Sequence, residues 1–201
     1  MKKILLTIIC VLLSFSIHAK TLKDYERQAE SGNPESAFKL GIMYEFGLKD
    51  QVKPNLNKAI RYYEISYNNG EPKAAARLGV INYERSDTKK AIEYFKFGAE
   101  QGESLSEAYL GKILEKSGKS DTALRFYEKS VKKGNPYGKM FLGEYYLKNE
   151  TKGSDNFIKG YALLVNANKV NKDAKIIISK YPYKFNKTEQ ETLRKYMRQY
   201  Q

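Results

Sequence analysis

Apart from one cysteine and one histidine, the side chains that could carry out chemistry in this 201-residue chain are those of serine, lysine, tyrosine, aspartate and glutamate. Cysteine and histidine occur once each, as Cys10 and His18, and tryptophan is absent. The spacing Ser-x-x-Lys, found in some serine acylation sites, occurs at Ser36–Lys39, Ser86–Lys89 and Ser130–Lys133. A chain this rich in lysine produces such matches by chance. We therefore assign no catalytic residue and expect that the protein is not an enzyme.

Residues 1–19 have the pattern of a secretory signal peptide. Lys2 and Lys3 precede an almost wholly apolar run from Ile4 to Ile17, and His18-Ala19 gives a cleavage site before Lys20. The run is shorter than a membrane-spanning helix requires. We expect cleavage here, no stable membrane insertion afterwards, and export to the periplasm or beyond. The alternative is an uncleaved N-terminal anchor.

Cleavage at this point would remove Cys10 and His18. The mature chain would then have no disulfide, no thiolate nucleophile and no zinc site built from histidine and cysteine. It would also lack the most common general base. Its glycines do not follow the order of a phosphate-binding loop. We therefore expect no cofactor and no metal.

An internal repeat indicates which elements must position any site. Leu-Gly pairs are separated by 38, 32 and 32 residues, and a second set of glycines has the same spacing. The Leu-Gly pairs are Leu40-Gly41, Leu78-Gly79, Leu110-Gly111 and Leu142-Gly143, and the second set is Gly32, Gly70, Gly102 and Gly134. Periods in this range are typical of stacked helical hairpins.

Each repeat carries the signals of two helices. Pro34, Pro72 and Pro136 each follow a glycine by two residues, so the glycine ends one helix and the proline begins the next. The glycine of a Leu-Gly pair destabilises its helix by about 1 kcal/mol relative to alanine. Its recurrence at the same position therefore indicates that a partner helix approaches closely there. Aromatic pairs in the second helix, Tyr62-Tyr63, Tyr94-Phe95 and Phe126-Tyr127, would fill the space opposite. Stacked hairpins can bury an apolar face that one hairpin cannot.

This pattern resembles the SEL-1-like repeat (SLR), a relative of the tetratricopeptide repeat. The first copy matches at Ser36, Leu40, Gly41, Tyr44, Lys58, Ala59, Tyr62, Tyr63 and Gly70. The resemblance covers about residues 32–171. The chain departs from the family at Asn82 and Leu114, which replace a tyrosine, and in its short period of 32 residues. The resemblance implies an all-α, right-handed α-solenoid of helix-turn-helix repeats.

We expect four segments along the chain. They are a signal peptide (1–19), an N-terminal capping helix (20–32), about four SEL-1-like hairpins (33–171), and a degenerate repeat with a C-terminal capping helix (172–201). In the last segment, Thr188 and Glu191 have the spacing of a capping box. They predict a helix over residues 187–201.

The formal net charge of the chain is +13. From Glu150 onward, eleven lysines and arginines face five acidic residues. A basic surface favours acidic partners such as a protein, an anionic lipid or a polysaccharide. The alternative is a well-solvated, lysine-rich surface with no binding role. Nucleic acid is disfavoured because no nucleic-acid-binding motif is present.

The resemblance also implies a function, because SEL-1-like proteins are typically adaptors that hold a protein in a concave groove. By analogy with tetratricopeptide grooves, residues two and five positions either side of the repeat leucine face the partner. These positions are Phe38, Ile42, Glu45, Ala76, Val80, Tyr83, Lys112, Glu115, Tyr137, Met140, Glu144 and Leu147. We expect an exported, monomeric scaffold that binds or neutralises a partner, with acidic proteins as the favoured class. The alternative is an envelope hydrolase or polysaccharide-modifying enzyme.

Overall fold

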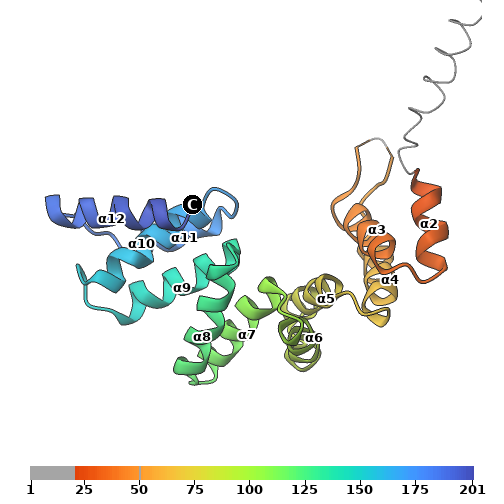
Figure 1. Cartoon of the computed structure of the whole chain (residues 1–201), viewed down its shortest axis with the longest axis horizontal. Coiled ribbons are helices and arrows are strands. Elements are labelled where there is room, and N and C mark those ends of the chain that lie inside the picture. The colour runs from red at the N-terminus through yellow and green to blue at the C-terminus, as the bar shows by residue number, and fades with distance from the viewer. Residues whose placement is uncertain (1–20, 50) are drawn as a thin grey trace, which may run out of the picture. The chain divides into compact units, whose positions relative to one another are not determined.

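The computed structural model describes residues 21–49 and 51–201 (Figure 1). The predicted signal peptide, residues 1–19, lies outside the described residues. Within the described part, eleven helices account for the regular structure, together with one isolated bridge between Leu48 and Val52. The predicted all-α solenoid class is confirmed.

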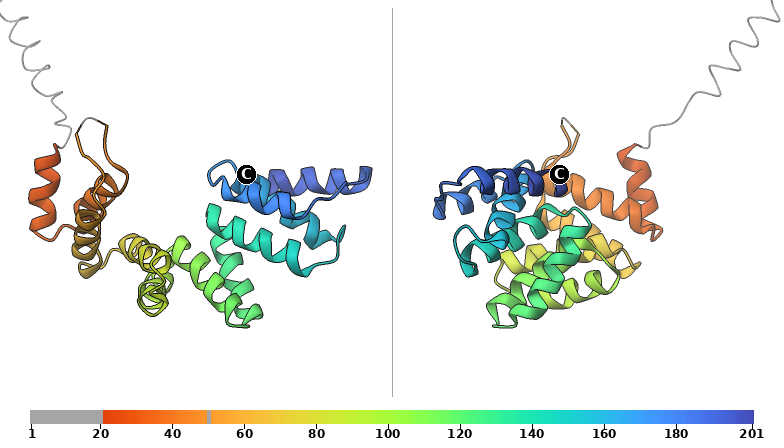
Figure 2. Two further views of the ribbon diagram at one scale, coloured as in Figure 1. Left: turned by 180° about the vertical axis from the view of Figure 1, so that it is seen from behind. Right: turned by 60° about the vertical axis from the view of Figure 1, so that its left-hand side comes forward.

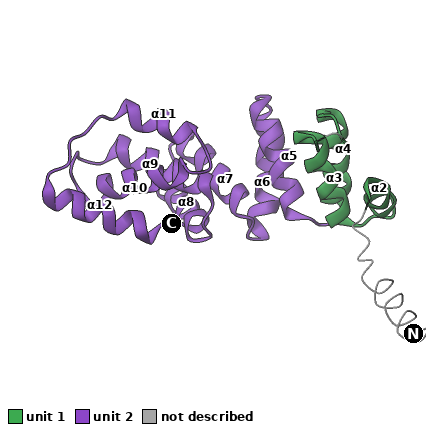
Figure 3. Ribbon diagram, turned by 90° about the horizontal axis from the view of Figure 1, so that it is seen from above, with its two compact units in different colours: residues 1–69 green, residues 70–201 purple. Residues whose placement is uncertain are grey.

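The chain divides into two compact units, which Figure 3 shows in different colours. Unit 1, residues 1–69, contains α2 (Leu22–Glu30), α3 (Pro34–Phe46) and α4 (Leu56–Asn68). Unit 2, residues 70–201, begins with α5 (Pro72–Glu84), α6 (Thr88–Glu100), α7 (Ser104–Lys116) and α8 (Ser120–Lys132). It continues with α9 (Pro136–Asn149), α10 (Asp155–Ala167), α11 (Asp173–Lys180) and α12 (Lys187–Gln199). Four pairs pack closely as hairpins: α3 with α4, α5 with α6, α7 with α8, and α9 with α10.

The helix boundaries follow the predicted glycine and proline signals. Pro34, Pro72 and Pro136 are the first residues of α3, α5 and α9. The glycines that precede the first helices adopt the left-handed conformation, with φ of 87° at Gly32 and 86° at Gly70. This conformation lets the chain reverse between two helices without the strain a side chain would add.

The glycines of the Leu-Gly pairs face an aromatic ring in the first three hairpins. A Cβ atom added to Gly41 would lie 2.3 Å from the Tyr63 ring, and one added to Gly79 would lie 2.5 Å from the Phe95 ring. The third hairpin repeats this contact between Gly111 and Tyr127 at 2.6 Å. These distances leave no room for a side chain, so the predicted close approach of the partner helix is confirmed.

The long first period arises from the connection between α3 and α4. Residues 47–55 form this connection, which the Leu48–Val52 bridge closes. In the second hairpin only residues 85–87 separate the two helices. The extra residues therefore enlarge a loop and leave the helices at the length of their counterparts.

Helix α12 caps the C-terminal end of unit 2 by packing against α10, and both are visible among the blue helices of Figure 2. The Asn166 side chain donates to the Met197 carbonyl at 2.9 Å, and Lys139 donates to the Tyr200 carbonyl at 2.6 Å. Leu193 and Met197 of α12 are half-buried.

The predicted capping box of α12 is wrong by two residues. Asn186 is the N-cap and accepts a hydrogen bond from the Glu189 amide at 3.0 Å, and the Glu189 carboxylate accepts one from the Asn186 amide at 2.8 Å. Asparagine is at least as good an N-cap as threonine. Thr188 therefore lies inside the first turn.

Candidate partner-binding surface

The predicted groove residues all lie on the first helices of the hairpins. Three of them are on α3 in unit 1, and nine are on α5, α7 and α9 in unit 2.

In unit 1 the three residues are half-buried, and two of them support the ring of Tyr63. The Phe38 ring centroid lies 5.8 Å from that of Tyr63, and the Tyr63 hydroxyl donates to the Glu45 carboxylate at 2.5 Å. Ile42 is also half-buried. Phe38 and Glu45 therefore hold the ring that fills the space beside Gly41.

In unit 2 four of the nine residues belong to the core. Ala76, Val80, Met140 and Leu147 are between 1% and 6% exposed. Side chains this buried offer little contact area to a partner. The other five are half-buried and still accessible to solvent. They are Tyr83, Lys112, Glu115, Tyr137 and Glu144.

A charged network joins three of these five residues. Lys112 Nζ lies 2.9 Å from Glu144 and 3.5 Å from Glu115, and Tyr127 donates to Glu115 at 2.7 Å. Burial alone would lower the pKa of Lys112, but the hydrogen bond to Glu144 and the charges of both carboxylates raise it. Lys112 therefore stays charged and paired. Lys112 and Glu144 are one repeat period apart, so the register of the repeats brings them together.

Tyr83 and Tyr137 belong to an aromatic cluster centred on Tyr109. The Tyr109 ring lies 5.5 Å from Tyr83, 5.6 Å from Tyr137 and 5.3 Å from Phe141 between ring centroids. Phe95 stacks on Tyr109 at 5.0 Å. We call Tyr83, Phe95, Tyr109, Tyr137 and Phe141 the aromatic cluster. It links the first helices α5, α7 and α9.

The groove prediction missed Tyr109 and Phe141. Both precede the leucine of a Leu-Gly pair by one residue and are 32 residues apart. The repeat spacing could have identified them as equivalent positions. Each is only 7% exposed, so they support the surface tyrosines from below.

The prediction also missed Lys116, which lies at the edge of the aromatic cluster beside Tyr83. Its ammonium donates to the Tyr83 hydroxyl at 2.5 Å and lies 5.0 Å from the ring centroid. A hollow of about 340 Å³ opens beside them, lined by Tyr83, Thr88, Ile92, Ile113, Lys116 and Ser117. An apolar floor with a tyrosine and an ammonium at its edge is suited to a side chain of a protein partner.

Two of the three Ser-x-x-Lys pairs have structural contacts. Ser36 donates to the Gln28 side chain at 2.8 Å, while Lys39 pairs with Glu35. Ser130 is buried and donates to the Ser104 carbonyl at 2.7 Å. The third pair begins at Ser86, in the turn before α6, with φ of 64°. Among residues 21–49 and 51–201, no group of three histidine, cysteine or acidic residues is placed to hold a metal ion.

Comparison with known proteins identifies a repeat family. The profile of the Sel1 repeat matches residues 34–71, 72–103 and 107–135. Comparison with curated proteins gives no match.

Several solved structures resemble the chain over most of its length. A protective antigen of uropathogenic Escherichia coli, c5321, displays an SLR fold. It is 25% identical with a TM-score of 0.68, over 89% of this chain and 40% of the antigen. A Sel1 repeat protein from Oxalobacter formigenes is 22% identical with a TM-score of 0.66, over 87% and 75% of the two chains. Immunity protein Pa5087 from Pseudomonas aeruginosa is 15% identical with a TM-score of 0.55, over 89% and 73%. The chain thus spans less than half the length of the antigen.

Proposed function

The chain belongs to the Sel1 repeat family, and we propose that it is a non-catalytic protein-binding scaffold of the bacterial periplasm. Proteins built from Sel1 repeats are generally scaffolds for protein interaction. A scaffold needs a surface that is rigid before its partner arrives, because ordering that surface during binding would weaken the affinity.

The observation that carries the proposal is the aromatic cluster with the hollow beside Tyr83. Tyr83 and Tyr137 are half-buried, and the buried ring of Tyr109 contacts both. Lys112, Glu115 and Glu144 form a polar network on the same helices. Large aromatic side chains held in place and surrounded by polar groups are typical centres of binding energy.

An acidic protein is the class of partner that the charge of the chain favours. The formal net charge of +13 attracts acidic surfaces over long distances and raises their association rate. A scaffold that covers the active surface of an acidic protein would also inhibit the activity of that protein.

Affinity capture tests the scaffold role against the alternative of an envelope hydrolase. We expect the tagged protein, purified from cells that export it, to carry one specific protein in stoichiometric amount. We also expect the purified chain to turn over no peptidoglycan, polysaccharide or ester substrate. Turnover that needs no partner protein would contradict the proposal.

We further propose that the chain is exported after cleavage before Lys20. None of the helices in the described ranges is both long and apolar enough to cross a membrane. We expect mass spectrometry of the protein from the envelope fraction to find an N-terminus near Lys20. A full-length chain held in the inner membrane would contradict export by cleavage.

A further inference from the structure

A groove lies between the second helices α6 and α8 of unit 2. It consists of two hollows of about 350 and 560 Å³, which share Ala99, Glu100 and Lys129. The first is lined in addition by Lys96, Leu110 and Phe126, and the second by Gly102, Glu107, Lys132 and Lys133. We call the combined hollow the α6–α8 groove. None of its lining residues borders the hollow at Tyr83.

The groove combines an apolar floor with lysines at its edge. Phe126 is half-buried and Leu110 is buried, so both can present apolar atoms without being free to move far. Lys129 Nζ lies 5.5 Å from the centroid of the Phe126 ring. A ligand therefore meets aromatic carbon and an ammonium group at the same place.

The lysines of the groove differ from Lys112 in their pairing. Lys96, Lys129 and Lys132 are exposed, and within the described ranges no ion pair involves them. Lys133 is different, because it pairs with Glu107 at 2.7 Å and donates to the Gly102 carbonyl at 2.7 Å. Three positive charges therefore remain available to an incoming anion.

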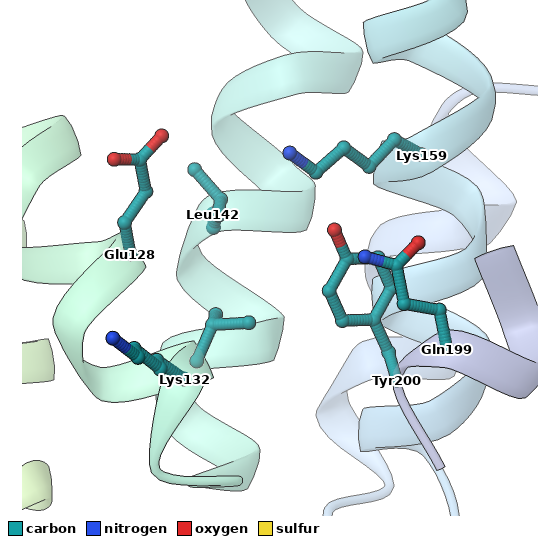
Figure 4. A pocket seen from close by; sticks show the side chains of 7 residues that line it. Glu128, Lys132, Leu142, Lys159, Gln199 and Tyr200 are labelled. Atoms are coloured by element: carbon teal, nitrogen blue, oxygen red, sulfur yellow. The ribbon is translucent and has the colours of Figure 1, made fainter.

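A further hollow of about 330 Å³, which we call the extension, meets the groove at Lys132, the one residue that lines both. Figure 4 shows Lys132 and Lys159 on opposite sides of this extension. Burial alone would lower the pKa of Lys159, but Tyr146 and Tyr200 raise it, so Lys159 adds a fourth positive charge. Leu142 and Val131 continue the apolar lining.

We propose that the α6–α8 groove and this extension bind an acidic polypeptide segment with interspersed apolar side chains. The proposal rests on the protein-binding role, but it assigns the acidic ligand to a surface other than the aromatic cluster. Acidic side chains would pair with Lys96, Lys129 and Lys132, and apolar side chains would cover Phe126 and Leu110.

The groove fits a polypeptide better than a bare polyanion such as polyphosphate. The exposed carboxylates of Glu100 and Glu128 lie among the lysines and would repel a ligand that offers only negative charge. Glu107 is buried and already paired with Lys133, so it adds little to this repulsion. A polypeptide supplies N–H donors that suit the two exposed acceptors, together with its own acidic groups.

The test measures fluorescence anisotropy of a labelled peptide of alternating glutamate and leucine against the mature chain. The Lys129→Glu/Lys132→Glu variant is compared with Lys175→Glu/Lys180→Glu, which makes the same charge change at exposed positions of α11. We expect the groove variant to bind the peptide at least about tenfold more weakly, and the control pair to lose less than about threefold. All four lysines are exposed, so circular dichroism should be unchanged in both variants.

Two further measurements make the result specific. Polyglutamate of equal length and inorganic polyphosphate should bind more weakly than the alternating peptide, because neither covers the apolar floor. The Tyr83→Ala/Tyr137→Ala variant should keep its affinity for the peptide, which separates this groove from the surface of the proposed function. Equal losses in the two lysine pairs, or polyphosphate binding as tight as the peptide, would overturn the proposal.

Discussion

Replacing Gly79 by leucine is expected to lower the free energy of unfolding by about 2–4 kcal/mol. A Cβ at this position would lie 2.5 Å from Cε1 of Phe95, whose side chain is completely buried. The ring cannot move aside without disturbing Tyr109, which stacks on it at 5.0 Å. The helix propensity of leucine returns only about 1 kcal/mol.

The control for this prediction is Lys96→Ala, on the helix that also carries Phe95. Lys96 is exposed, so its replacement should change the unfolding free energy by no more than about 0.5 kcal/mol. Denaturant midpoints of the two variants measure the difference. If Lys96→Ala proved the more destabilising change, the account of the repeat glycines would be wrong.

The repeat register made the contacts within the hairpins predictable from the sequence. A glycine within a helix is unfavourable, so Gly41, Gly79 and Gly111 indicated a close contact at each position. The aromatic pairs of the second helices indicated which side chains would make that contact. The fourth hairpin departs from this rule. Gly143 faces the side chain of Leu164 and the carbonyl of Gly160, because a second glycine lets the two backbones approach. The repeat pattern therefore predicts that α9 and α10 pack against each other. It does not predict which atoms make the contact in this altered copy.

The positions of the groove residues were predictable, but their exposure was not. The repeat spacing places Lys112 and Glu144 on equivalent turns of neighbouring first helices, and they form an ion pair at 2.9 Å. The same rule selected Val80 and Met140, which are buried. The analogy with tetratricopeptide repeats gives the direction of a side chain. It does not give how far the neighbouring repeat covers it.

The sequence also predicted an excess of positive charge, part of it concentrated after Glu150, but not which lysines are available to a partner. The excess of lysine is a property of composition, whereas its availability depends on which carboxylates lie within reach. Lys112 is neutralised by two glutamates, while Lys129 and Lys132 are exposed in the α6–α8 groove. Only the packing of α6, α7, α8 and α9 distinguishes the paired lysine from the exposed ones.

Replacing Tyr83 and Tyr137 together by alanine is expected to abolish binding of the protein partner at working concentrations while the fold persists. Both rings are half-buried, and neither fills the space beside a repeat glycine. The buried Tyr109, Phe95 and Phe141 would keep the core of the cluster together. An aromatic residue at the centre of an interface commonly contributes about 2 kcal/mol or more, so the pair should weaken binding at least about a hundredfold.

Tyr145→Ala is the matched control for the tyrosine variant. Tyr145 is half-buried on the same helix as Tyr137, and its ring contacts Tyr146 outside the aromatic cluster. This variant should bind the partner with an affinity close to that of the original chain. A comparable loss in Tyr145→Ala would show that the effect comes from stability and not from a contact with the partner.

Calorimetric titration of the captured partner into Tyr83→Ala/Tyr137→Ala tests the central claim most directly, namely that the first helices of unit 2 form the binding surface. Circular dichroism must first show that the variant is folded. The account predicts a folded protein whose affinity falls at least about a hundredfold. Unchanged affinity in the folded variant, with binding lost only when Lys172, Lys175 and Lys180 are reversed in charge, would contradict it and place the site on the basic C-terminal segment.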